Sequence, residues 1–156
     1  MKKNQKGFSL LGVIIAMFIT MIGLVSILNL SSNSLKAASY SKSRLIASGL
    51  AQEGMEIIQG MRKSNINWDD WYDSVSSGDY RLQYDSSSLL SYSYTPLRIN
   101  SSGLYQYDES SYTPFYRKIS LDKISNAEVK VVVEVSWDIK GERYSLIIED
   151  RLWNWK

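Results

Sequence analysis

The strongest pattern in this chain is an uninterrupted apolar run over residues 8–30, which contains no charged side chain. As a helix, rising about 1.5 Å per residue, the run reaches roughly 35 Å, enough to cross the hydrocarbon of a bilayer. Lys2, Lys3 and Lys6 precede it, and no acidic residue does. Because positive residues favour the cytoplasmic side, we expect the N-terminus in the cytoplasm and the C-terminal part outside.

An amphipathic helical pattern follows over residues 35–61, with polar side chains on its other face. Its apolar face contains Ile46, Leu50, Ile57 and Met61, with Ala47, Ala51 and Ile58 beside them. This spacing predicts a helix that turns one face toward a sheet. Arg62 and Lys63 suit the C-terminus of such a helix, because cations are favoured there.

The remaining residues carry strand patterns. Short strands are expected at residues 80–84, 89–99, 104–107 and 115–121. Alternation over residues 129–137 predicts a longer strand, which a turn at Lys140 and Gly141 joins to a partner carrying Tyr144, Leu146 and Ile148 on one face. The pattern therefore predicts an α+β fold, with a long N-terminal helix packed on an antiparallel sheet of three to five strands. Residues 152–155 are expected to hold the tail by aromatic burial.

The amino-acid composition limits the catalytic and metal chemistry that can be expected of this chain. The 156 residues include neither cysteine nor histidine, so the commonest general base, the commonest metal ligand and every disulfide are missing. We therefore expect no catalytic residue, no metal site, no cofactor and no enzyme activity. Formal net charge is +2. This near-neutral balance gives no electrostatic reason to expect a nucleic-acid partner.

Two sets of acidic residues are candidates for metal binding or acid/base catalysis. Five aspartates could offer oxygen ligands to calcium, but they lack the spacing of a known calcium loop, and a solvated acidic turn is favoured. They are Asp69, Asp70, Asp73, Asp79 and Asp85. Glu53 and Glu56 are interpreted as exposed helix residues or subunit contacts rather than an acid/base pair.

The motif KGFSLL at residues 6–11 offers a processing signal in front of the apolar run. A secretory signal would be cut behind the run, where only a weak site at residues 37–39 is found. The motif resembles that of the type IV pilin and pseudopilin superfamily, whose prepilins carry a basic leader, glycine, phenylalanine, a small polar residue and two aliphatics. The other interpretation is a plain signal-anchor.

This resemblance implies a set of site residues and partners. The prepilin peptidase/methyltransferase would recognise Lys6 and Gly7, cut between Gly7 and Phe8, and methylate Phe8. Further implied partners are membrane lipid before assembly, the inner-membrane assembly platform, and other pilins or pseudopilins through the N-terminal helix. In relatives the stem loosens on assembly. Gly23, Asn29 and the serines near them also lower helix propensity, so a bend or melted turn is expected between residues 23 and 34.

Gly12 departs from the family pattern. Major pilins carry glutamate at this fifth mature position, where it is thought to neutralise the terminal amine of a neighbouring subunit in the apolar filament core. A buried charge is tolerable only if paired. Without the carboxylate this chain cannot offer that compensation, which suits a subunit at the tip or initiation complex. Lineage drift is the alternative explanation.

A looser resemblance covers residues 50–68, which are similar to the stem of minor pilins of the type IV pilus modification protein kind. The expected domains are a leader at 1–7, a transmembrane or filament-core helix at 8–34, an amphipathic half at 35–63 and a head at 64–156. The chain is thus expected to be a minor pilin or pseudopilin, first in the cytoplasmic membrane and then in a pilus or pseudopilus. The alternative is a membrane-anchored extracytoplasmic binding module that does not polymerise.

The Ser/Tyr-rich segment at residues 72–112 has two interpretations. Tyrosine and serine give adaptable contact surfaces, so the segment could bind another minor pilin, an adhesion target or a glycan. The favoured interpretation is that these tyrosines only cover the sheet and its loops.

Overall fold

The computed structural model describes residues 6–108 and 110–154, and its first element is the long helix α1, Lys6–Ser64. The chain divides into two compact units, Met1–Ser41 and Lys42–Lys156. Both units include part of α1, and each is described here by itself. As predicted, Arg62 and Lys63 lie in the last turn of α1.

The bend expected between residues 23 and 34 was wrong, because every residue there is helical. A glycine costs a helix only about 1 kcal/mol relative to alanine, which a long helix can absorb. Hydroxyl side chains nearby bond to carbonyl oxygens of the preceding turn and leave the helix unbroken. Ser26 Oγ, for example, donates to the Ile22 carbonyl oxygen at 2.8 Å.

The second unit contains an antiparallel sheet of five strands in the order β2-β1-β6-β7-β8. Its members are β1 Gly78–Arg81, β2 Leu90–Ser91, β6 Phe115–Ser125, β7 Glu128–Ile139 and β8 Glu142–Trp153. A small second sheet has the order β4-β3-β5, made of β3 Arg98–Ile99, β4 Tyr105–Gln106 and β5 Ser111–Tyr112. The predicted α+β fold, a long N-terminal helix followed by antiparallel sheet in a pilin-like arrangement, is confirmed.

The hairpin between β7 and β8 forms at the predicted turn. Lys140 and Gly141 take positive φ angles of 53° and 88°. Two consecutive left-handed residues match the twist of a two-residue hairpin loop. Ile139 then pairs with Glu142, and the register continues without a shift to Glu128 opposite Trp153.

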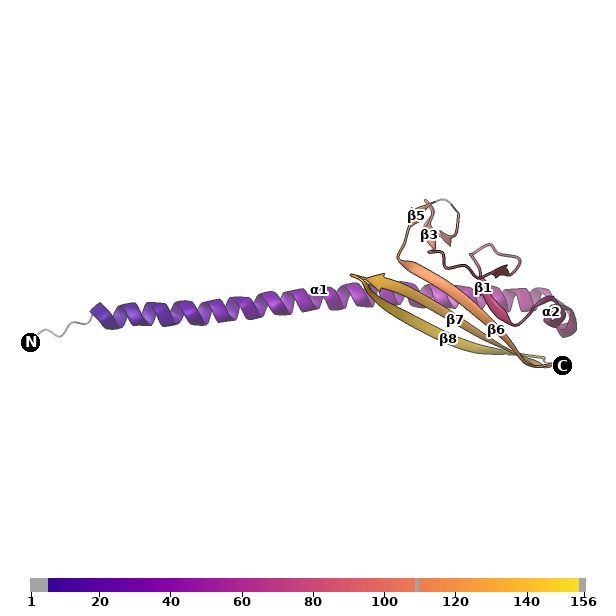
Figure 1. Ribbon diagram of the computed structural model, residues 1–156, viewed down its shortest axis with the longest axis horizontal. Coiled ribbons are helices and arrows are strands. Elements are labelled where there is room, and N and C mark those ends of the chain that lie inside the picture. Colours follow the sequence, from indigo (N-terminus) through magenta and orange to yellow (C-terminus); the bar gives the residue numbers. More distant parts are fainter. Residues whose placement is uncertain (1–5, 109, 155–156) are drawn as a thin grey trace, which may run out of the picture. The chain divides into compact units, whose positions relative to one another are not determined.

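The core lies between the last turns of α1 and one face of the large sheet, where β6, β7 and β8 run alongside the helix (Figure 1). On β7 the alternation predicted from the sequence buries Val129, Val131, Val133, Val135 and Trp137. From the helix, the buried apolar residues are Ala47, Leu50, Ala51, Met55 and Ile58. Of the other residues predicted on this face, Ile46, Ile57 and Met61 are half-buried.

Gly54 and Arg117 fix the distance between helix and sheet. A Cβ atom at Gly54 would lie 3.2 Å from Val133 Cγ1 and 3.3 Å from Arg117 Cδ, so glycine permits the close approach. Arg117 is only 1% exposed. Its guanidinium donates to the carbonyl oxygens of Leu50 at 3.0 Å and Leu82 at 2.5 Å, and thereby joins α1 to the segment after β1.

The position of Glu53 differs from the prediction that it is an exposed helix residue. It does not lie on the exposed side of the helix, because its Oε1 is 3.3 Å from Nη1 of the buried Arg117. A buried guanidinium needs a counter-charge, and Glu53 supplies it. Glu56 remains exposed and accepts a hydrogen bond from Gln52 at 2.9 Å.

Two further expectations were wrong, and one element was not predicted. The single strand expected at residues 89–99 is two short strands in different sheets, since Pro96 between them cannot donate to a ladder. A short helix, α2 at Trp68–Ser74, was not predicted. Trp153 is 42% exposed rather than buried, because β8 directs alternate side chains away from the core. Trp155 lies outside the described residues.

Candidate functional site

Two regions could carry function: the apolar N-terminal part of α1 and the sheet face that points away from α1. The aspartates considered as calcium ligands do not form a cluster in either region. Asp69 and Asp70 lie in the first turn of α2, whereas Asp79 lies on β1 and accepts a hydrogen bond from Ser120 Oγ at 2.5 Å. Within residues 6–108 and 110–154, no group of three or more His, Cys, Asp or Glu side chains could hold a metal ion.

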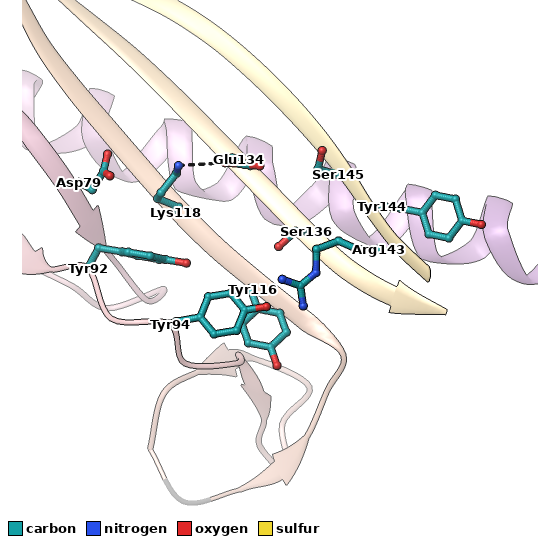
Figure 2. Close-up of a pocket in the computed structure, with 10 residues that line it drawn as sticks. All are labelled: Asp79, Tyr92, Tyr94, Tyr116, Lys118, Glu134, Ser136, Arg143, Tyr144 and Ser145. Carbon is teal, nitrogen blue, oxygen red and sulfur yellow. Dashed lines mark ion pairs between the residues drawn. The ribbon is translucent and has the colours of Figure 1, made fainter. Parts of the chain in front are cut away.

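The outward sheet face contains a cavity of about 310 Å³. Figure 2 shows its lining, which consists of Asp79, Tyr92, Tyr94, Tyr116, Lys118, Glu134, Ser136, Arg143, Tyr144 and Ser145. Three of the tyrosines come from β6 and the loop after β2. From the sequence, Asp79 was considered only as a calcium ligand and Tyr144 only as a strand residue, and no cavity was predicted from either. The general signal was the richness of residues 72–112 in tyrosine and serine.

Ion pairs fix the charged side chains of this face. Lys118 Nζ lies 3.1 Å from Glu134 Oε2, and this hydrogen bond raises the pKa of Lys118. Arg143 binds both carboxylate oxygens of Asp138, at 2.9 and 2.8 Å, and lowers the pKa of that carboxyl. Burial raises the pKa of Tyr92, a shift that the charge of Lys118 partly opposes. At neutral pH Lys118 and Arg143 are therefore charged, the Asp138 carboxyl is ionised, and Tyr92 is neutral.

The apolar stem is defined here as residues 10–30 of α1. All of its large apolar side chains are between 42% and 68% exposed. From Leu10 onward α1 is long and apolar enough to cross a membrane, and none of its most apolar window is buried. A helix of this composition in the core of a soluble domain would be covered by its own chain, so this surface requires cover from lipid or other chains.

Hydroxyl groups in the apolar stem are satisfied within the helix. Thr20 Oγ1 donates to the carbonyl oxygens of Ala16 at 3.0 Å and Met17 at 2.9 Å. Together with the Ser26 bond to Ile22, this means that the Thr20 and Ser26 hydroxyls need no hydrogen-bond partner from lipid.

The predicted processing residues begin the helix. Lys6, Gly7 and Phe8 belong to the first turn of α1, and the leader residues before Lys6 lie outside the described part of the chain. Gly12 lies in the stem, and a Cβ atom there would meet nothing within 4 Å. The packing of this chain therefore does not itself require glycine at that position.

Comparison with known proteins addresses this N-terminal region. Residues 2–28 match the family model of the prokaryotic N-terminal methylation motif. The matched span covers the basic leader, Gly7, Phe8 and most of the apolar stem. No curated protein and no solved structure gave a significant match.

The methylation motif supports a type IV pilin-like protein that prepilin peptidase processes. It is a motif of structural subunits rather than of enzymes, and it implies assembly with other pilins. Together with the exposed apolar stem, it indicates membrane anchoring followed by assembly into a pilus-like fibre.

Proposed function

We propose that this chain is a minor pilin or pseudopilin, a structural subunit of a type IV pilus or pseudopilus. Prepilin peptidase recognises Lys6 and Gly7, cuts between Gly7 and Phe8, and methylates Phe8. One observation carries the proposal: the methylation motif leads directly into a charge-free helix whose apolar side chains are exposed along the whole stem.

In this proposal the apolar stem is surrounded by lipid before assembly and by other pilin stems after it. Before assembly, the stem spans the cytoplasmic membrane with its N-terminus in the cytoplasm, where lipid covers the apolar side chains. The inner-membrane assembly platform then moves the subunit into the fibre, where the stems of other pilins replace lipid. In this division of the chain, residues 1–7 are the leader, 8–34 the filament core, 35–63 the amphipathic half and 64–156 the head.

Gly12 supports a place at the tip or in the initiation complex. A subunit without a carboxylate at this position cannot neutralise the terminal amine of a neighbour, although it still presents its own amine. Because a Cβ atom at Gly12 would meet no atom of this chain within 4 Å, the fold does not require glycine at this position. The cost of an unpaired amine is avoided where that neighbour is absent.

Assembly can be tested with fibres sheared from cells that express the full chain with its native prepilin peptidase. The proposal expects the protein in the fibre fraction, and expects its loss from that fraction when the peptidase gene is deleted. A non-polymerising binding module would stay in the cell membrane in both strains. That result would remove the pilin proposal in favour of the anchored module.

Tip placement is tested separately by Gly12→Glu, with Gly12→Ala as the control that adds a side chain without charge. Immunogold labelling is expected to find the wild type and Gly12→Ala at fibre ends. Gly12→Glu is expected to spread label along the shaft. Unchanged location and fibre number in Gly12→Glu, or uniform labelling in the wild type, contradict the tip proposal.

A further inference from the structure

We propose that the cavity on the outward face of the five-stranded sheet is a binding site for a neutral saccharide. The inference concerns the head alone and does not depend on whether the chain enters a fibre. It is drawn from the aromatic stack, the free hydroxyls and the charge balance of the residues that surround the cavity.

An aromatic stack forms one wall. The rings of Tyr94 and Tyr116 lie with centroids 4.4 Å apart and planes 12° from parallel. The Arg143 guanidinium carbon lies 5.2 Å from the Tyr94 centroid, and its bond to Asp138 holds it there. Figure 2 shows the two rings together beside this guanidinium. The stack holds Tyr94 in place while leaving it 55% exposed, which provides a fixed, flat surface for the C–H face of a sugar ring.

Free hydroxyls supply polar contacts. Tyr92, Ser136 and Ser145 line the cavity, and their hydroxyl groups make no hydrogen bond within the described part of the chain. The raised pKa of Tyr92 keeps its hydroxyl neutral, so that it can both donate and accept. Sugar hydroxyls have the same dual character, and a cluster of such groups next to an aromatic face complements them.

The charges of the lining disfavour the competing ligand classes. Lys118 and Arg143 are balanced by Asp79 and Glu134, and the Lys118–Glu134 pair is already formed, as the dashed line in Figure 2 marks. An anion would have to compete with carboxylates for both cations. An apolar ligand would strip water from charged groups without replacing their hydrogen bonds.

Size and placement fit a short saccharide. The cavity of about 310 Å³ is at the lower end of the range of roughly 300–1,000 Å³ typical of small-molecule sites. Because it lies on the face opposite the α1 contact, its occupation requires no opening of the core.

The test uses the purified full chain in lipid nanodiscs on an array of glucose, galactose, mannose and N-acetylglucosamine oligosaccharides, with sialylated and sulfated oligosaccharides as charged probes. Positive signals are titrated up to about 10 mM, which covers weak sites. We expect at least one neutral oligosaccharide to bind, and Tyr94→Ala to weaken it about tenfold or more, as removal of an aromatic contact commonly does. Ser136→Phe, which fills the cavity without altering a tyrosine, is expected to abolish binding.

Tyr84→Ala is the matched control, since Tyr84 is also exposed but does not line the cavity. It should bind like the wild type, and all variants should show a single cooperative urea transition, which confirms that they are folded. The proposal is overturned if no neutral saccharide binds. It is also overturned if binding is confined to charged probes, or if it survives unchanged in Ser136→Phe. These outcomes leave the fibre experiments unaffected, so the two proposals can fail separately.

Discussion

Two stretches of the same helix use apolar side chains in opposite ways. In the apolar stem, residues 10–30, every large apolar side chain is at least 42% exposed. Between residues 47 and 58, the buried apolar side chains of α1 are at most 7% exposed. The first stretch is apolar all round, whereas the second alternates buried residues with exposed ones such as Gln52 and Glu56.

The glycines differ by whether they face the sheet, because Gly49 lies on the exposed side of the second stretch whereas Gly54 is buried. Gly12, Gly23 and Gly49 have no atom within 4 Å of a Cβ position, but Gly54 is in close contact with Val133 and Arg117. The two stretches already differ in the periodicity of their apolar positions, and that difference has a physical reason. What distinguishes them is the partner that covers each surface: the second stretch is covered by its own sheet, and the stem requires lipid or other subunits. If this division is right, mutations in the two stretches should have separable effects.

The largest effect on the head is expected from Arg117→Ala. The change leaves Glu53 without its cation and removes the donor from two buried carbonyl oxygens. We expect the free energy of unfolding to fall by about 3–5 kcal/mol, as when a buried pair loses one partner. Urea unfolding in detergent micelles, followed by tryptophan fluorescence, measures the head selectively because all five tryptophans lie beyond α1.

Lys130→Ala is the control for Arg117→Ala. Lys130 is also ion-paired, with Glu149 at 3.1 Å, but both side chains are partly exposed. Its loss should cost much less than that of Arg117. Equal losses in both variants would mean that Arg117 does not join helix and sheet as described.

Leu24→Lys in the apolar stem is expected to weaken membrane retention while leaving the stability of the head unchanged. A lysine at the centre of a membrane helix costs about 2.5–3.5 kcal/mol of insertion free energy. The variant should be extracted more readily from membranes by alkaline carbonate, with Leu24→Ile behaving like the wild type. Since Leu24 is 59% exposed and outside the head unit, the urea midpoint of the head should not change. A destabilised head, or unchanged membrane retention, would break the separation of the two stretches.

A smaller effect is expected from valine at two helix glycines. Gly54→Val forces methyl groups against Val133 and Ile119, so we expect a loss of about 1–3 kcal/mol from overpacking. Gly49→Val has open space around it and should change stability by less than about 0.5 kcal/mol, because valine is no worse a helix former than glycine. Similar urea midpoints for the two variants would show that Gly54 does not set the helix–sheet distance.

The parts of the fold that the sequence could predict are those governed by regular alternation. Residues 129–137 and the turn at Lys140 and Gly141 were predicted because period-two burial and a two-residue hairpin loop are local signals. The helix face around Leu50 was predicted for the same reason. The α2 helix also had a signal that was overlooked: Asn67 precedes it, and Asp69 and Asp70 lie in its first turn.

Other features depend on contacts distant in sequence. Alternation places Arg117 on the same face as Phe115 and Ile119, but no pattern indicated that it would be paired with Glu53. The outward cavity likewise brings together residues from β1, the loop after β2, and β6 to β8, and these become neighbours only through the sheet order. The bend in the stem was predicted from the behaviour of relatives and from low helix propensity, and the continuity of a long helix outweighed that low propensity.

The N-terminal mass of the mature chain tests the central claim most directly. Protein extracted from membranes of cells with the native prepilin peptidase would be analysed by intact and peptide mass spectrometry. Removal of residues 1–7 and one added methyl group on Phe8 are the predicted result. A chain that still begins at Met1, or one cut beyond residue 30, would contradict the account, because the apolar stem would then not be the processed surface through which subunits assemble.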